Sequence, residues 1–168
     1  MGGFGVSATT GHSVMALDFK KLRARFGVCK GRVKYRLGAK PSFNDQPGHD
    51  FFKSDCSGFV RWLLFEATGG LVKLDEGSWH QRAWCDNHGF KLTDYILNAS
   101  VKDGRLRIAF ISPPNGHVWL VLDGKTYECY SGKGVGSRSW DSRIEGGKSS
   151  LARAVDFCYV LTDPEVRS

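Results

Sequence analysis

Apolar residues recur at three- and four-residue spacing in several stretches of the first hundred residues, and this period predicts amphipathic helices. Asp18 suits the first turn of the first helix, and Gly27 is expected to end it. Gly69-Gly70 is expected to end the second helix, because glycine readily adopts the left-handed conformation of a helix end. The predicted helices span residues 14–26, 57–68, 78–87 and, as a single short turn or two, 92–97.

From residue 106 onwards the pattern changes to short apolar runs separated by turn residues, which predicts strands of an antiparallel sheet. Asp123-Gly124 is a typical two-residue hairpin turn. Two polar or glycine-rich segments, residues 40–53 and 131–150, are expected to be loops. Helices followed by strands indicate an α+β fold, with the helices packed on a central antiparallel sheet. The expected strands span residues 106–112, 116–122, 126–130 and 155–161.

The chain is long enough for one domain with a substantial core, since 41% of its 168 residues are hydrophobic. We expect a flexible N-terminal arm over residues 1–12 and a single domain over residues 13–168. No apolar run approaches the roughly 20 residues of a membrane span, so stable membrane insertion is not expected. The first residues lack the basic start and apolar run of a signal peptide, which predicts synthesis in the cytoplasm without one.

The cysteine count indicates whether disulfides are expected, and the net charge indicates which partners are expected. Five cysteines without repeated pair spacing argue against a disulfide framework and leave room for a free thiol. The formal net charge of +7 favours anionic partners such as carboxylate-bearing polymers. No nucleic-acid-binding module is recognisable, so nucleic acid is not an expected partner.

The strongest candidate for chemistry is Asp55-Cys56-Ser57-Gly58-Phe59, where a polar segment gives way to the most apolar helix. A cysteine at the start of a buried helix meets unpaired backbone N–H groups and the positive end of the helix dipole, which favour a thiolate. Cys56 is therefore the predicted nucleophile, and its own N–H is a candidate donor to an oxyanion. The alternative is a cysteine that is simply buried.

His117, at the start of an apolar strand, is the predicted base for Cys56. The hairpin at Asp123-Gly124 should bring Glu128 near His117, where its carboxylate would fix the imidazole tautomer. A satisfied structural histidine and an ordinary strand-surface carboxylate remain the alternatives for these two positions. No metal or organic cofactor is needed, and Cys85-Asp86-Asn87-His88 lacks the second ligand pair of a zinc site.

The motif Asp55-Cys56-Ser57-Gly58-Phe59, the Gly116-His117-Val118 strand and a polar residue on the next strand resemble NlpC-type peptidoglycan cysteine peptidases. The resemblance covers residues 33–161 and implies a papain-like fold with the nucleophile at the N-terminus of a buried helix. Residues 134–140 are similar to phage-encoded or prophage-encoded members, which include bacteriolytic endolysins.

The resemblance also implies an oxyanion-binding role for Tyr35, for which plain packing is the alternative. The chain departs from the family in two ways. Glu128 stands where many members have histidine, and the segment between Tyr35 and Cys56 is longer than usual.

The resemblance implies a hydrolase that cuts an amide bond in peptidoglycan stem peptides, acting as a monomer on the cell wall or in the periplasm after delivery by phage lysis or secretion. Two alternatives stay open: a papain-like amidase or acyltransferase on a non-wall substrate, and a non-catalytic wall-binding module. The residues expected to bind substrate are Asp55, Ser57, Arg36, Lys53 and Arg138.

Overall fold

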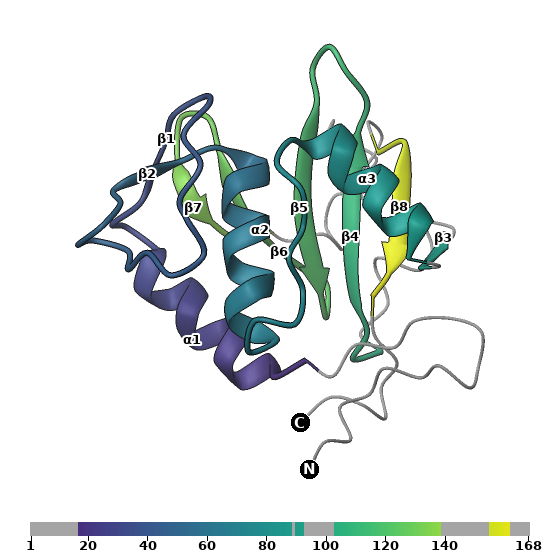
Figure 1. Cartoon of the computed structure of the whole chain (residues 1–168), viewed down its shortest axis with the longest axis horizontal. Helices are drawn as coiled ribbons and strands as arrows, with labels where there is room; N and C mark the ends of the chain where they lie inside the picture. The colour runs from purple at the N-terminus through teal and green to yellow at the C-terminus, as the bar shows by residue number, and fades with distance from the viewer. Residues whose placement is uncertain (1–16, 89, 93–102, 139–154, 162–168) are drawn as a thin grey trace.

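A computed structural model describes residues 17–88, 90–92, 103–138 and 155–161. In this part of the chain three helices lie on one face of an antiparallel sheet (Figure 1). The helices are α1 (Phe19–Cys29), α2 (Cys56–Ala67) and α3 (Ser78–Asn87). The strands are β1 (Lys34–Tyr35), β2 (Lys53–Ser54), β3 (Lys91–Leu92), β4 (Leu106–Ile111), β5 (His117–Leu122), β6 (Lys125–Tyr130), β7 (Gly134–Gly136) and β8 (Phe157–Val160).

The main sheet has the strand order β3-β8-β4-β5-β6-β7, and every neighbouring pair is antiparallel. The β5–β6 hairpin turns at Asp123-Gly124, where both residues have positive φ (50° and 78°), as a primed turn requires. A separate parallel pair, β1 and β2, lies beside β7. Val135 N–H of β7 donates a hydrogen bond at 3.0 Å to the carbonyl of Val33, the residue before β1. The α+β prediction is confirmed.

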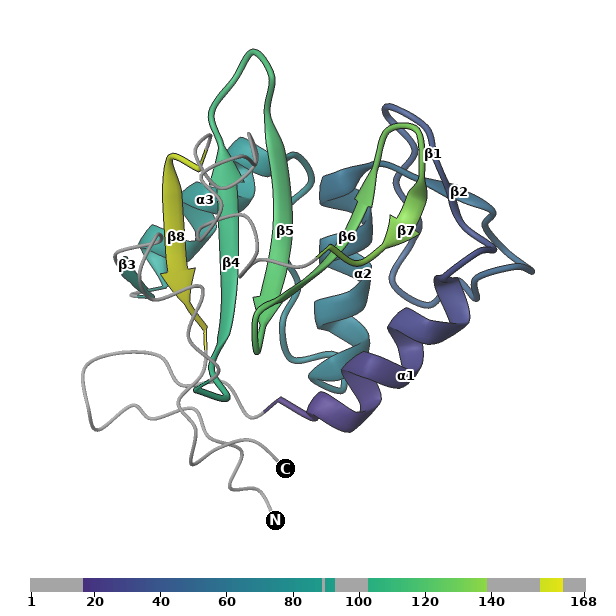
Figure 2. The same cartoon turned by 180° about the vertical axis from the view of Figure 1, so that it is seen from behind.

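The helix α2 packs on the sheet between α1 and α3, and Figure 2 shows it from behind the sheet. It packs on β5 and β6 with one side and on α1 with another. Nine of its residues are buried, among them the large side chains of Phe59 and Trp62, which have no exposed surface. Burying these rings is the main reason that a twelve-residue helix is stable here.

Both ends of the first helix differ from the prediction. α1 begins at Phe19 after its N-cap Asp18, and it continues past Gly27 to bury Cys29; residues 14–16 lie outside the described residues. The stop at Gly27 was wrong because a glycine in a helix costs only about 1 kcal/mol, which the burial of Cys29 and Phe26 offsets.

Short strands also occur where loops or a helix were expected. β2 begins at the last residue of the expected loop 40–53, β7 lies inside the expected loop 131–150, and Leu92 belongs to β3 rather than to a short helix. β2 and β3 pair with β1 and β8, which are distant in the sequence, so no local pattern indicates these two pairings. β7 instead forms a hairpin with β6 directly before it, in a segment whose glycines favoured a loop. Most of the predicted helix over 92–97 and the predicted arm over 1–12 lie outside the described residues.

None of the helices in the described part of the chain has the length and apolar character needed to span a bilayer. All five cysteines are described, and each is a free thiol.

Candidate active site

Cys56 is the first residue of α2, and the residues around it form a tight N-cap. The Asp55 side chain accepts a hydrogen bond from Gly58 N at 2.8 Å, which satisfies one of the free amides of the first turn. A Cβ on Gly58 would lie 3.0 Å from Ala39 O, Asp55 Oδ1 and Ser54 Oγ, so any larger residue would push these neighbours aside. The order of residues in the motif thus follows from the packing around the helix start.

His117, the first residue of β5, faces the start of α2. Its Nε2 lies 2.9 Å from Glu128 Oε1, and Cys56 is near enough to raise the pKa of the imidazole. Because Nε2 is engaged by Glu128, Nδ1 is the nitrogen left for the thiol. The imidazole also stacks on Trp119, with ring centroids 5.1 Å apart.

The surroundings of His117 favour its charged form. Burial alone would lower its pKa, but the hydrogen bonds to Cys56 and Glu128 and their negative charges raise it from 6.5 to about 9. At neutral pH the arrangement therefore supports an imidazolium beside the Glu128 carboxylate.

Glu128 has no exposed surface, so its charge depends on its partners. Arg138 binds it with two nitrogens, at 2.9 Å (Nε to Oε2) and 2.5 Å (to Oε1), and the Thr126 hydroxyl donates to Oε2. Burial alone would raise the pKa of Glu128, but the hydrogen bonds from Arg138, His117 and Thr126 lower it to about 2. Glu128 is thus an ionised acceptor that orients the His117 ring.

Arg138 is itself held in place through its backbone. Arg138 N donates to Thr126 Oγ1 at 2.7 Å, and Thr126 N donates to Arg138 O at 2.8 Å. The guanidinium also lies 3.9 Å from the centroid of the Tyr130 ring. Arg138 was expected to bind substrate, but its guanidinium is instead bound to Glu128.

Tyr35 lies close to the thiol, on the strand next to the one that leads into α2. It pairs with Ser54 across β1 and β2. Its pKa is raised by burial first and then by the negative charges of Cys56 and Asp55. The hydroxyl therefore stays protonated at neutral pH and can donate a hydrogen bond near Cys56.

The carboxylate of Asp55 has no free acceptor position for a substrate. Its Oδ1 accepts from Gly58 N at 2.8 Å and Ser57 Oγ at 3.3 Å, and its Oδ2 accepts from Gly38 N at 3.1 Å and from Lys40 Nζ. A carboxylate offers about four acceptor sites, so all are filled. Ser57 is only 2% exposed, and its hydroxyl also accepts from Lys40 Nζ at 3.0 Å. Asp55 and Ser57 were expected to bind substrate, but both side chains are engaged in stabilising the start of α2.

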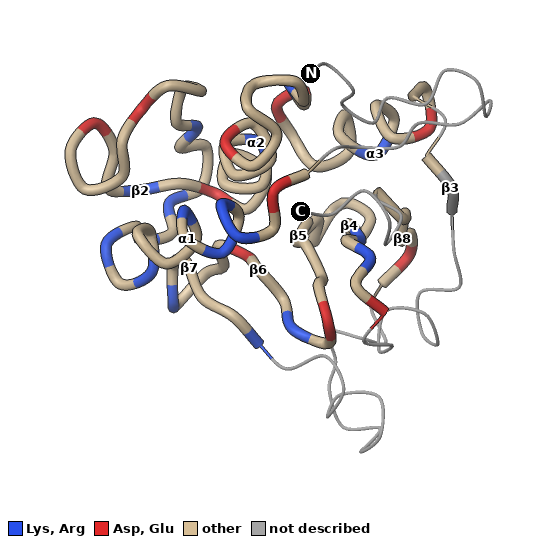
Figure 3. Tube along the Cα trace, turned by 90° about the horizontal axis from the view of Figure 1, so that it is seen from below, with Lys and Arg blue, Asp and Glu red and all other residues tan. Residues whose placement is uncertain are grey.

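Arg36, which directly follows β1, and Lys53, in β2, are both exposed. Successive side chains of a strand point to opposite faces, so Lys53 faces away from the buried Ser54. Lys34 lies directly opposite Lys53 on this outer face. Basic residues gather around α1, β2 and β7, as Figure 3 shows.

The other four thiols differ from Cys56 in their exposure. Cys56 is 9% exposed, whereas none of the other four cysteines exposes any surface. Burial raises the pKa of each of these four, to about 12 for Cys29, Cys129 and Cys158. Cys129 donates to Ser54 O at 3.3 Å and faces the core, on the opposite side of β6 from Glu128. Cys56 is thus the thiol suited to chemistry.

Three residues of the site carried no role in the sequence analysis: Lys40, Thr126 and Gln81. Thr126 could have been found, because it stands two residues before Glu128 and so shares its face of β6. Gln81, fully buried, donates to Ser57 O and Asp75 O at 2.9 Å and ties α3 to the first turn of α2. Lys40 and Gln81 meet partners 15 or more residues away, which no local spacing signals.

A scan against models of protein families finds none that matches this chain, and a search of curated proteins finds no match either. Among the described residues no group of histidine, cysteine, aspartate and glutamate side chains could hold a metal ion. The site itself brings together a base, the carboxylate that orients it and a nearby thiol.

Proposed function

We propose that this protein is a cysteine hydrolase of the NlpC type, with a papain-like fold, that cleaves an amide bond in peptidoglycan stem peptides. The observation that carries the proposal is the position of His117, whose Nε2 lies 2.9 Å from Glu128 Oε1 and whose pKa is raised by the nearby Cys56 as well as by Glu128. A nucleophile, a base and a group that orients the base are the components of covalent amide hydrolysis. The start of a buried helix adds a positive potential at the sulfur.

In the acylation step, the Cys56 thiolate attacks the amide carbonyl and forms a tetrahedral oxyanion. The Cys56 N–H and the Tyr35 hydroxyl are the donors for this oxyanion, and removing one such donor typically slows turnover about 10²–10³-fold. Collapse of the intermediate breaks the C–N bond as the His117 imidazolium protonates the leaving amine. The products are the free amine and a thioester on Cys56.

In the deacylation step, neutral His117 takes a proton from water, and the hydroxide attacks the thioester. The carboxylic acid leaves, and the proton on His117 restores the imidazolium–thiolate pair. Glu128 stays ionised throughout, since its pKa is about 2, and it keeps Nε2 of His117 as a donor. These steps use only residues of this chain.

The net charge of +7 suits a substrate that carries carboxylates, as stem peptides do. The enzyme would act on the wall after delivery by phage lysis or secretion.

The test is digestion of purified sacculi by wild type, Cys56→Ala and His117→Ala, with mass spectrometry of the released muropeptides. His49→Ala is the matched control for His117→Ala, because His49 lies on an exposed loop with 83% of its side chain accessible. We expect new amine and carboxyl termini with wild type and His49→Ala only. Identical fragments from Cys56→Ala would refute the proposal. Thiol-dependent turnover of a glutamine or lipid amide, with intact sacculi, would assign the same site to a different substrate.

A further inference from the structure

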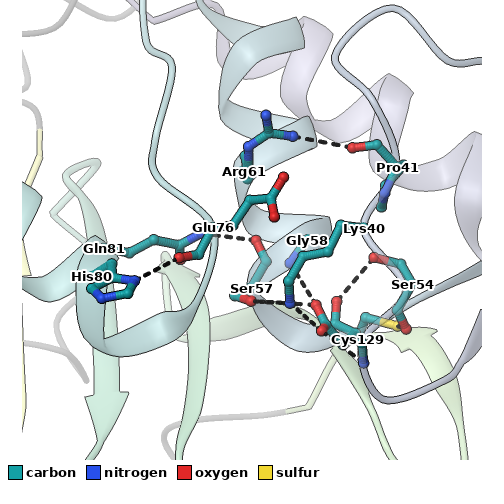
Figure 4. A network of polar contacts seen from close by, with 12 residues as sticks. Lys40, Pro41, Ser54, Ser57, Gly58, Arg61, Glu76, His80, Gln81 and Cys129 are labelled. Carbon is teal, nitrogen blue, oxygen red and sulfur yellow. Dashed lines mark hydrogen bonds and ion pairs between the residues drawn. The ribbon is translucent and has the colours of Figure 1, made fainter.

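The segment between Tyr35 and Cys56 contains a lysine, Lys40, whose side chain reaches the start of α2. Lys40 Nζ forms an ion pair with Asp55 Oδ2 and donates to Ser57 Oγ at 3.0 Å (Figure 4). Its side chain is 22% exposed, and that of Asp55 is 5% exposed. One ammonium group thus contacts the residues immediately before and after Cys56.

The chain around Lys40 is held from both sides, so this contact is built into the fold. Ala39 O accepts from Asp55 N at 2.9 Å, and Gly38 N donates to the Asp55 carboxylate at 3.1 Å. Beyond the lysine, Pro41 O accepts from Arg61 of α2 at 3.1 Å. The loop therefore wraps around the first turn of α2 and fixes the lysine against it.

The carboxylate of Asp55 creates an electrostatic conflict at this position. As an N-cap it stabilises α2, but its negative charge, one residue from Cys56, opposes a second negative charge on the sulfur. The negative charges of Asp55 and Cys56 both act on the same Tyr35 hydroxyl, so the two groups share one small region. A cation on Asp55 removes this conflict.

We propose that Lys40 is a positioning residue of the active site, whose ammonium neutralises the Asp55 carboxylate so that the positive end of α2 acts on Cys56 without opposition. The relevance of this to catalysis rests on the proposed function, but the effect on the thiol does not. A purely structural role for Lys40, as a partner for a buried carboxylate, would leave the reactivity of a folded protein unchanged.

The experiment measures the rate of Cys56 alkylation by iodoacetamide across pH, by peptide mass spectrometry. It needs no substrate, so it can fail independently of the proposed hydrolase activity. The four other thiols are fully buried, and Cys56→Ala gives the background. The variants are Lys40→Met, Lys40→Arg, Asp55→Asn and the double variant Lys40→Met/Asp55→Asn, with Lys73→Met as an exposed control of equal charge change.

We expect Lys40→Met to move the alkylation profile to higher pH and to slow the reaction about tenfold at neutral pH, a cost typical of one nearby charge. Asp55→Asn should move the profile the other way, and the double variant should return near wild type. Lys40→Arg and Lys73→Met should stay within about twofold of wild type, since each leaves the Asp55 charge neutralised.

An unchanged profile in Lys40→Met would overturn the proposal, as would a double variant as slow as the single one. Circular dichroism monitors folding. Should Lys40→Met not fold, the proposal stands or falls on Asp55→Asn, which must lower the pH of half-maximal alkylation.

Discussion

The two sides of the candidate site each bury a carboxylate, but the partners and the role of that carboxylate differ. On the sheet, Glu128 accepts only from side chains, those of His117, Arg138 and Thr126. At the helix, Asp55 accepts from two backbone amides, Gly58 N and Gly38 N, in addition to side chains. Glu128 contacts the base directly, whereas Asp55 shapes the backbone that carries the nucleophile.

The difference shows how one physical problem, an isolated buried charge, has two local solutions. Arg138 binds Glu128 through two nitrogens in a planar fork, which fixes the direction of the carboxylate as well as its charge. Lys40 places a compact ammonium on Asp55, which neutralises the charge with less directional constraint. Direction matters on the sheet side because the carboxylate has to orient an imidazole.

The largest effect is expected from Glu128→Ala. It removes the acceptor of His117 Nε2 and leaves the Arg138 guanidinium without its partner, so turnover should fall about 10²-fold or more. Glu128→Gln keeps an acceptor oxygen but not the charge, and it should lose only about tenfold. Steady-state rates on a defined muropeptide measure both. Equal rates for Glu128→Gln and wild type would remove the carboxylate charge from the mechanism.

Arg138→Met tests the cation of the same pair. Leaving the buried Glu128 carboxylate with only His117 and Thr126 as partners should reduce the free energy of unfolding by about 3 kcal/mol. In wild type, the stability from Glu128 is present above its ordinary pKa of 4.5 and is lost as the pH falls toward about 2. Arg138→Met should lose this stability at a higher pH than wild type, and urea titrations at several pH values would measure the loss.

The control for Arg138→Met is Arg23→Met, which breaks the exposed 3.6 Å pair with Asp123. It should cost about 1 kcal/mol or less. A similar cost for both variants would contradict a special role for the buried pair.

The pH profile of turnover should bend downward on the alkaline side near the pKa of His117, which is about 9. Above it the imidazolium that protonates the leaving amine is lost, about tenfold per pH unit. Because this pKa is raised, the stability it contributes is fully present below 6.5 and is lost as the pH rises through 9. In Glu128→Gln the bend should move to lower pH, and an unmoved bend would argue against His117 as the titrating group.

The smallest effect is expected from the double variant Arg36→Gln/Lys53→Gln. Both side chains are exposed, so we expect turnover on a muropeptide to change about twofold or less, as for other exposed charges. A loss of tenfold or more would show that these residues hold substrate carboxylates after all.

The sequence predicts the parts of this fold that depend on local pattern. α3 spans the predicted residues, and α2, β4, β5 and β6 differ from prediction by about one residue at their ends. The hairpin at Asp123-Gly124 follows directly from its turn chemistry. Together these elements carry Cys56, His117 and Glu128, which explains why the three candidate residues could be named before any coordinates.

The remaining parts were not predictable from local pattern. β7 contains two glycines in three residues, which favour a loop, although it forms a hairpin with β6 directly before it. Arg138 was expected to face substrate, since nothing near it in the sequence shows that the chain turns back onto Thr126 and Glu128. Lys40 lies in an expected loop, and nothing near it in the sequence indicates that its side chain contacts the start of α2.

The stacking of His117 on Trp119 has an optical consequence. A charged imidazole within about 6 Å of an indole lies in cation–π range, and its proton quenches indole emission. The protein therefore carries its own fluorophore at the base, and its emission should brighten as His117 loses its proton. The chain has five tryptophans, so the part of the emission that Trp119→Phe removes would be the part that follows the protonation of His117, without a label.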